Sequence, residues 1–386
     1  MDISVNQSTA PRISVPVIAL TLYAVASGYL MSLIPLMLGE YGIESSMASW
    51  LASLFYAGLL FGAMFIERVV QKLGHRNAFV YCLAAFVATI AVMPMLPNAW
   101  VWLAARFIAG IAVAGVFVIV ESWLMAGDEN GRAKRLGFYM VSLYGGSALG
   151  QLAIGVLGIS GSLPFIAITS LIIMAMLVLM FGRSEQPNSH ESTSLSLKQI
   201  AKLSHAAIIG CVVSGLTLGA IYGMMPVELA NRHIGHDSIG TLMALVILGG
   251  MVVQPMVTVL NKYVGRSLLM AFFCLLGIFS VGITLLSSEI TVLAVALFLL
   301  GMATFALYPI AINLGCENLD ERFIVSAAQV MLFSYSIGSV VGPVIADLFM
   351  PQRHGLLGYL FAIMLATCIY MLLAAAKTKR RMIAGQ

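Results

Sequence analysis

Apolar segments long enough to cross a membrane fill this chain and constrain its fold more than any other feature. A hydrocarbon layer about 30 Å thick needs about 20 apolar residues in a helix, and lipid offers no partners for backbone polar groups, so such segments must be helical. Charged residues make up only 9% of the sequence, whereas soluble domains contain about 25%. The sequence holds twelve such segments: Pro16–Leu38, Met47–Ile66, Ala78–Leu96, Trp100–Met125, Leu136–Leu157, Pro164–Phe181, His205–Val227, Ile239–Leu260, Ser267–Leu286, Ile290–Leu314, Phe323–Phe349 and Leu356–Ala376.

A repeat divides these segments into two sets of six. We predict an all-α membrane protein of twelve transmembrane helices in two pseudo-symmetric six-helix bundles, residues 1–182 and 204–386, joined by a polar cytoplasmic linker at 183–203. Glycines recur at a nearly fixed offset between the two sets. Gly146 and Gly150 form a Gly-x-x-x-Gly motif in the fifth segment, and Gly338 and Gly342 form the same motif in the eleventh, where Pro343 follows it. This motif lets helices pack closely. Four glycine pairs recur 191 or 192 positions apart: Gly74 and Gly265, Gly110 and Gly301, Gly146 and Gly338, and Gly150 and Gly342.

The distribution of positive charge predicts the orientation. If both termini are cytoplasmic, 17 of the 20 Lys and Arg residues lie in cytoplasmic segments, two lie outside and Arg106 lies within a helix. Because cytoplasmic loops carry such an excess, we predict a multi-pass protein of the bacterial inner membrane. The net charge of +4 then reflects orientation among membrane lipids and predicts no nucleic-acid partner. The basic tail from Lys377 is a cytoplasmic anchor in this interpretation, or a site for lipid headgroups.

The sequence lacks the usual patterns of catalysis and metal binding. Its five Cys show no Cys-x-x-Cys spacing and its six His are scattered, so we predict no metal site. It contains no phosphate-binding Gly-x-x-x-x-Gly-Lys-Ser/Thr motif and no Ser/His/Asp cluster. We therefore expect neither an enzyme nor a cofactor, and we expect a monomer.

The fourth segment carries the most informative charge. Arg106 lies inside the apolar stretch Leu103–Trp123, followed by the small residues Gly110 and Gly115. A cation at the centre of a bilayer costs roughly 2.5–3.5 kcal/mol on insertion scales, so it needs a partner or a wet cavity. One interpretation is a water-accessible path that Arg106 lines. The alternative is a structural Arg whose charged end reaches the membrane interface.

Two motifs resemble the major facilitator superfamily, and the resemblance extends along nearly the whole chain. Arg106 with Gly110 is similar to its fourth-helix motif Arg-x-x-x-Gly. The loop after the second segment resembles the signature Gly-x-x-x-Asp-Arg-x-Gly-Arg-Arg at stretched spacing and with Glu in place of Asp: Gly62, Glu67-Arg68 and Gly74-His75-Arg76.

The YcaD-like branch of bacterial inner-membrane transporters is a closer match. Related drug/proton antiporters carry Gly-Pro in the fifth helix, whereas Gln151 follows Gly150 here and Gly342-Pro343 occurs in the eleventh segment. The branch resemblance rests on four short stretches: Glu121-Ser122-Trp123, Gly137-Phe138-Tyr139-Met140, Gly150-Gln151 and Ala306-Leu307-Tyr308-Pro309.

The resemblance implies alternating access around a cavity lined by the first, fourth, seventh and tenth helices. Polar and aromatic residues of these helices are the predicted substrate contacts: Tyr23, Ser27, Arg106, Phe117, Thr217, Tyr222, Tyr308 and Asn313. Residues of the cytoplasmic loops and helix ends are the predicted gate: Gly62, Glu67, Arg68, Gly74, Arg76, Glu121, Arg132 and Arg135.

Two of the predicted gate acids have alternative interpretations. An ion pair of Glu67 shifts the conformational equilibrium only if it exists in one state, and the alternative is a static surface pair worth about 0–1 kcal/mol. Glu121 belongs either to the same cytoplasmic charge network or to a partly dry site, where an acid can couple transport to protons.

Together these features predict a secondary active transporter that moves a small organic solute across the inner membrane by alternating access. Protons are the expected coupling ion, and an antiporter that drives efflux is favoured. Proton-coupled uptake of a small metabolite is the alternative within this class. A non-transporting membrane sensor or scaffold is the alternative outside it. An Arg106 that faces the cavity unpaired favours an anionic substrate.

Overall fold

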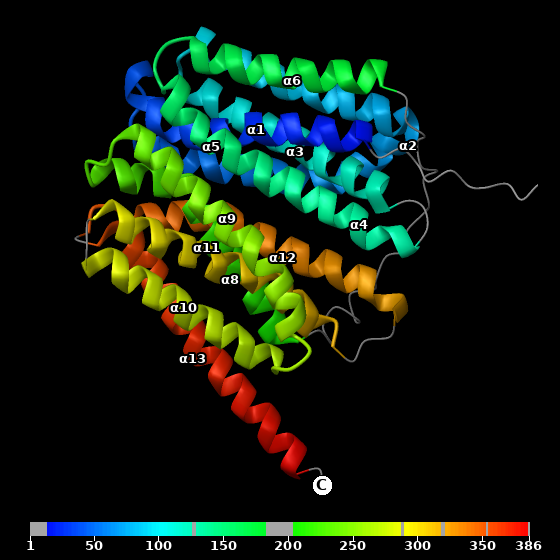
Figure 1. The fold of residues 1–386 in the computed structure, drawn as a ribbon, viewed down its shortest axis with the longest axis vertical. Coiled ribbons are helices and arrows are strands. Elements are labelled where there is room, and N and C mark those ends of the chain that lie inside the picture. The colour runs from blue at the N-terminus through cyan, green and yellow to red at the C-terminus, as the bar shows by residue number, and fades with distance from the viewer. Residues whose placement is uncertain are drawn as a thin grey trace, which may run out of the picture.

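The computed structural model describes residues 14–125, 129–182, 204–286, 289–317, 321–352 and 354–384, and helices joined by short connections make up these residues (Figure 1). The predicted linker at 183–203 lies outside the described residues. The elements are α1 (Ser14–Met37), η1 (Leu38–Tyr41), α2 (Met47–Met95), α3 (Ala99–Met125), α4 (Glu129–Met140), the π-helical turn η2 (Val141–Gly145), α5 (Gly146–Leu157), α6 (Leu163–Phe181), α8 (His205–Asn231), α9 (His236–Leu260), α10 (Arg266–Leu286), α11 (Ile290–Gly315), α12 (Glu321–Asp347) and α13 (Gly355–Ala384).

Eleven helices of the described residues are long and apolar enough to cross a membrane. The sequence predicts twelve segments, and the difference lies in α2, which joins the second and third of them. Its 49 residues would extend about 73 Å if straight, far more than the hydrocarbon thickness. However, Gly74 has a non-helical φ of 76°, which glycine adopts freely. Ile66 and Cys82 both lie against Gly115 of α3, so α2 folds back on itself at Gly74.

The helices run back and forth between two faces of the molecule. We call the face that holds the start of α1, the Gly74 turn, the end of α3 and the start of α8 the terminal face. The far face holds the connections from α1 to α2, from α8 to α9 and from α12 to α13. In Figure 1 the terminal face is on the right. The two sets of helices, α1 to α6 (the first half) and α8 to α13 (the second half), lie one above the other.

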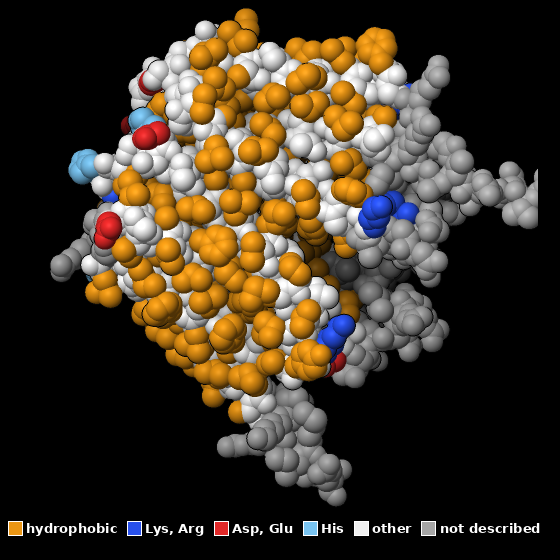
Figure 2. Space-filling view, viewed as in Figure 1, with side chains coloured by type: hydrophobic (Ala, Val, Ile, Leu, Met, Phe, Trp, Pro, Cys, Tyr) orange, Lys and Arg blue, Asp and Glu red, His pale blue; other side chains and the backbone are white. Residues whose placement is uncertain are grey.

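Apolar side chains cover the outer surface between the two faces. Val156 and Phe181 are each more than three-quarters exposed, and apolar side chains spread across both sets of helices (Figure 2). Soluble monomers rarely expose such large continuous apolar areas, so this belt faces lipid. Most of the Lys and Arg side chains seen in Figure 2 lie toward the terminal face, which is the face that the sequence predicts to be cytoplasmic.

The repeat in the sequence is also a repeat of helix contacts. Where two helices cross at a glycine, the missing side chain lets a neighbouring backbone come into contact. In the first set of helices, Gly58 contacts the backbone of Phe107 and Gly110 that of Phe55; in the second, Gly249 contacts Phe298 and Gly301 contacts Val246. Each residue of the second set lies 191 positions after its counterpart, so α9 and α11 pack as the first half of α2 packs on α3.

The Gly-x-x-x-Gly motifs form a second repeated contact. Both glycines of α5 pack on α1, and both glycines of α12 pack on α8. Gly146 lies against Ala24 and Gly150 against the Val25 carbonyl, whereas Gly338 lies against the Val212 carbonyl and Gly342 against that of Leu216. Pro343, inside α12, lies near Gly223 of α8. The same pairs of helices therefore meet in the same way in each half.

Adding one methyl group at Gly110 tests this close packing of helices. A Cβ at Gly110 would meet the Phe55 carbonyl and the Leu59 amide, and overpacking of this kind costs about 1–3 kcal/mol. We expect Gly110→Ala to lower the melting temperature in detergent. The matched control is Gly282→Ala in α10, where an added Cβ would meet open space and alanine favours the helix by about 1 kcal/mol. An equal loss of stability in both variants would contradict the packing account.

Candidate functional site

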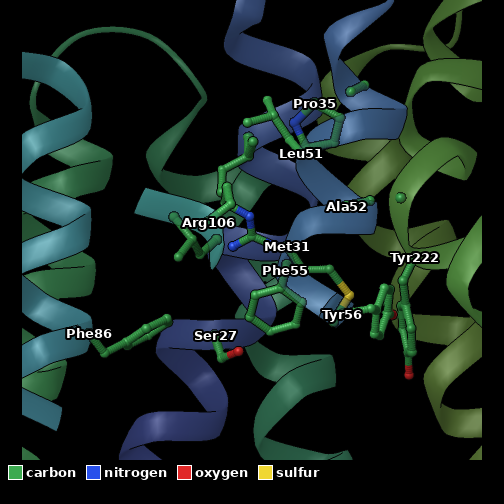
Figure 3. Close-up of a pocket in the computed structure, with 14 residues that line it drawn as sticks. Ser27, Met31, Pro35, Leu51, Ala52, Phe55, Tyr56, Phe86, Arg106 and Tyr222 are labelled. Atoms are coloured by element: carbon green, nitrogen blue, oxygen red, sulfur yellow. The ribbon is translucent and has the colours of Figure 1, made fainter. Parts of the chain in front are cut away.

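A cavity of about 40 Å³ lies where the two sets of helices meet. Its walls come from α1, from α3, from α8 and from the two arms of α2, which are the parts before and after Gly74. Residues of both halves therefore line it (Figure 3). At about 10–15 Å³ for each water, it holds a few water molecules, and an organic solute needs the halves to separate further. The lining residues are Ser27, Leu30, Met31, Ile34, Pro35, Ala48, Leu51, Ala52, Phe55, Tyr56, Phe86, Arg106, Tyr222 and Gly223.

Arg106 is the charged residue of this cavity. Its position is fixed by Gly110, one turn further along α3, which brings that helix onto the backbone of Phe55 in α2. The Arg106 Cζ atom then lies 4.2 Å from the centroid of the Phe55 ring, a cation–π contact worth about 0.5–2 kcal/mol. The Nε atom is buried and has no hydrogen-bond partner among the described residues.

The depth of Arg106 distinguishes the two interpretations of its charge. It is the eighth residue of α3, so its Cα lies about 10 Å from the far-face end of that helix. Phe55, the ninth residue of α2, lies at a similar depth. Because the guanidinium group stays over this ring instead of extending to the far face (Figure 3), Arg106 faces the cavity.

The rest of the lining is apolar with three hydroxyl groups. Tyr56 of α2 and Tyr222 of α8 lie beside each other on one side of the cavity, and Ser27 of α1 lies on another (Figure 3). Phe86, from the second arm of α2, lies beyond Ser27. The cavity therefore offers one cation, several hydroxyl groups and aromatic walls.

The predicted substrate contacts fall into two groups in the structure. Ser27, Arg106 and Tyr222 line the cavity. Tyr23 and Phe117 lie one layer behind it, with the Tyr23 ring 5.7 Å from that of Phe86 and 6.2 Å from that of Phe117.

The other predicted contacts lie outside this cavity. The Thr217 hydroxyl donates to carbonyls of its own helix. Tyr308 packs on Tyr335 with their ring centroids 4.8 Å apart. Asn313 is exposed and its Nδ2 donates to the Pro309 carbonyl. A substrate role for these residues stays a prediction.

Three aromatic residues of α2 line the cavity although they are not among the predicted substrate contacts. Phe55, Tyr56 and Phe86 line the cavity, whereas the family resemblance directs attention to the first, fourth, seventh and tenth helices. A signal was available at Tyr56, because a hydroxyl inside an apolar helix needs a polar partner or water.

Several of the predicted gate residues lie at the terminal face. The Tyr139 hydroxyl donates to Glu121 at 2.8 Å, and the buried Arg135 donates through Nε to the Leu124 carbonyl at 2.7 Å. Arg76 donates to the Gly182 carbonyl at 2.7 Å. Two of these bonds join α4 to α3, and the third joins the Gly74 turn of α2 to the end of α6.

The other predicted gate residues belong to α2 and α4. Glu67 and Arg68 are exposed before the Gly74 turn, and Gly62 lets α2 pack on Ile111 of α3. The side chain of Arg132 lies outside the described residues. Whether any of these residues acts as a gate stays a prediction.

The two halves contact each other closely at the far face. The Ser49 hydroxyl, near the start of α2, donates to Asp347 at the end of α12 across 3.3 Å. Gly155, near the end of α5, packs on the backbone of Asp237 near the start of α9. By contrast, the surface is hollowed between the halves toward the terminal face (Figure 2).

One buried amide lies at this contact between the halves. Gln151 is fully buried in α5, whose backbone there touches Gly240 of α9, and neither polar atom of its side chain has a partner among the described residues. Such a group costs about 1–3 kcal/mol, so Gln151→Leu should raise the melting temperature in detergent. Gln254→Leu is the control, because the Gln254 amide already donates to the Gly250 carbonyl. A Gln151→Leu protein that melts below the wild type, or a Gln254→Leu protein that gains as much stability, would contradict this expectation.

An apolar outer belt, two repeated sets of helices and a shared cavity between them define a membrane transporter. The family model of the Major Facilitator Superfamily matches residues 17–343. The chain therefore belongs to this superfamily, as the sequence motifs predict.

Individual relatives agree with this assignment. The chain is 31% identical over 340 residues to the uncharacterised MFS-type transporter YcaD of Salmonella enteritidis, covering 86% of this chain and 87% of that one. A mutant of the nucleoside transporter NupG has a similar fold, with a TM-score of 0.76 and 11% identity over 93% of this chain and 97% of that one. A bacterial homologue of the lysosomal transporter Spinster, in an inward-facing and unoccupied conformation, gives a TM-score of 0.70 at 14% identity over 94% and 95%.

Proposed function

We propose that this protein is a twelve-span, proton-coupled secondary transporter that exports a small amphipathic solute from the cytoplasm by alternating access. The proposal treats α2 as two spans joined at Gly74 and divides the chain into bundles 1–182 and 204–386. The observation that carries it is the Arg106 cavity, which residues of both halves line. A site between two repeats is what alternating access requires, because rocking one half against the other then exposes it to either side in turn.

The described arrangement supports one step of this cycle. The halves touch at the far face through Ser49 and Asp347, and the surface is hollowed on the opposite side (Figure 2). We propose that this is the inward-facing arrangement, with the terminal face cytoplasmic. Accessibility of a Lys72→Cys protein to an impermeant thiol reagent tests this orientation: labelling from the periplasm in intact cells would overturn it.

Glu121 is the acid that we propose to act at the terminal face. It lies on the same helix as Arg106, 15 residues further along, and accepts a hydrogen bond from Tyr139 of α4. A carboxylate held by one hydroxyl can exchange a proton with the cytoplasm as the halves move. We propose that Glu121 belongs to the cytoplasmic charge network with Glu67 and helps to close the terminal face. The alternative is that Glu121 is the acid whose protonation couples transport to protons.

Reconstituted protein tests transport and coupling together. Proteoliposomes with a trapped pH-sensitive dye and an imposed pH gradient should lose that gradient when a transported solute is added. We expect amphipathic solutes to do so with wild-type protein and not with Arg106→Leu protein. Solute movement that ignores the gradient would contradict proton coupling. Protein that moves no solute in either direction would favour a sensor or scaffold instead.

A further inference from the structure

The charges that line the cavity are strongly one-sided. Of its fourteen lining residues, Arg106 is the cation and none is Asp or Glu. A fixed positive charge in a site with low-dielectric walls raises the local concentration of anions and lowers that of cations. The cavity is therefore electrostatically suited to a negatively charged ligand.

No acid among the described residues neutralises Arg106. Arg106 forms no ion pair with an acid of the described residues, its Nε has no hydrogen-bond partner there, and Phe55 contacts it only through its ring. Buried charges are normally paired, so this guanidinium group can accept an anionic partner from outside the protein. Its planar fork of donors suits a carboxylate, which it can bind through two parallel hydrogen bonds.

The surroundings of Arg106 indicate the rest of the ligand. Phe55, Phe86, Tyr56 and Tyr222 present aromatic rings to the cavity (Figure 3), and rings stack well on flat apolar groups. Met31 lies between Arg106 and the two tyrosines, and its flexible side chain adapts to ligands of different shape. The hydroxyl groups of Ser27, Tyr56 and Tyr222 can donate to oxygen atoms of the ligand.

We propose that the solute carried by this site is an organic monoanion: a carboxylate attached to a flat apolar body, with the carboxylate on Arg106 and the body between the aromatic rings of the two halves. This inference rests on the proposed transport function and adds the charge selectivity of the site. Because Tyr56 belongs to the first half and Tyr222 to the second, a ligand admitted when the halves separate contacts both of them.

Three probes of the same shape and different charge test this inference. They are 2-naphthoate, the neutral 2-naphthamide and the cationic 2-naphthylmethylammonium ion, with benzoate as a smaller carboxylate. Dissociation constants are measured with purified full-length protein from the rise in melting temperature with probe concentration. We expect 2-naphthoate to bind wild-type protein at least about tenfold more tightly than 2-naphthamide, the preference that a hydrogen bond to a charged group provides, and the cation to bind most weakly.

Variants of Arg106 test whether this residue causes the preference for 2-naphthoate over 2-naphthamide. In Arg106→Gln protein the ratio of the two dissociation constants should fall to about one, while the affinity for 2-naphthamide changes little; Arg106→Lys should keep part of the preference. Arg266→Gln is the matched control, because Arg266 lies outside the cavity and pairs with Glu317. If Arg106→Gln protein does not fold, the Lys variant and the wild-type ratio still decide the matter. Equal binding of the three probes by wild-type protein, no stabilisation by either carboxylate at millimolar concentration, or an unchanged preference in Arg106→Gln would overturn the proposal.

Transport measurements separate this proposal from the one on which it depends. Protein that binds 2-naphthoate selectively but never exchanges it across proteoliposomes would contradict the transport function and keep the charge selectivity. Protein that exchanges neutral or cationic solutes and rejects carboxylates would keep the transport function and overturn the charge selectivity.

Discussion

Replacing Arg106 by leucine is expected to abolish transport while leaving the protein folded. A cation at the centre of a bilayer is unfavourable for insertion by roughly 2.5–3.5 kcal/mol, whereas the contact of Arg106 with Phe55 is a cation–π contact worth about 0.5–2 kcal/mol. Melting in detergent should therefore stay at the wild-type temperature or rise. Transport per folded molecule should fall about a hundredfold or more, because losing one partner of a desolvated charge pair costs about 3–5 kcal/mol.

The conservative variant sharpens this prediction. Arg106→Lys keeps a positive charge but loses the planar fork of donors, so we expect transport between those of the wild type and Arg106→Leu. Arg266→Gln, which removes a cation outside the cavity, should transport at the wild-type rate. Full transport per folded molecule in both the Leu and Lys variants would contradict a functional role and leave Arg106 as a packing residue.

Joining the two halves at the far face is expected to stop transport reversibly. Ser49 and Asp347 belong to different halves, and their side-chain oxygens are 3.3 Å apart. In a Ser49→Cys, Asp347→Cys protein, a short bis-methanethiosulfonate cross-linker, which forms a disulfide with each cysteine, should hold this face closed, and reduction of these disulfides should restore transport. Because alternating access requires this contact to open in every cycle, cross-linked molecules should carry no solute.

A cross-link within one half provides the matched control for this experiment. Ser160 donates a hydrogen bond to Glu40 at the same far face, and both residues belong to the first half. Cross-linking of a Glu40→Cys, Ser160→Cys protein should therefore leave transport unchanged. Full transport by molecules cross-linked between Ser49→Cys and Asp347→Cys would contradict alternating access at this interface.

Much of the fold could be predicted from the sequence because lipid restricts the backbone so strongly. Apolar length locates the helices, and the offset between Gly110 and Gly301 anticipates a contact that the structure repeats in both halves. The exception is α2, where helical structure continues through the polar stretch from Glu67 to Lys72 to the turn at Gly74. Apolar length does not reveal this, because polar residues form helices equally well beyond the hydrocarbon.

The site was harder to predict than the fold. A charge or hydroxyl inside an apolar helix can be recognised in the sequence as a candidate for a cavity, and Ser27, Arg106 and Tyr222 do line the cavity. Phe55 and Phe86 give no such signal, because helices that are apolar all round do not reveal which side faces a cavity and which faces lipid. Asn313 is polar but exposed, so polarity alone does not place a residue in the cavity either.

Distances between spin labels on both faces at once test the central claim, that the halves rock about the Arg106 cavity. One pair is placed at the exposed residues Lys72 and Lys262 of the terminal face, and the other at Ser45 and Gln352 of the far face. Double electron–electron resonance in nanodiscs is measured before and after protons or 2-naphthoate are added. The account predicts opposite changes: as one face closes, its labels approach, and the labels on the other face separate. Distances that change together on both faces, or on neither, would contradict it.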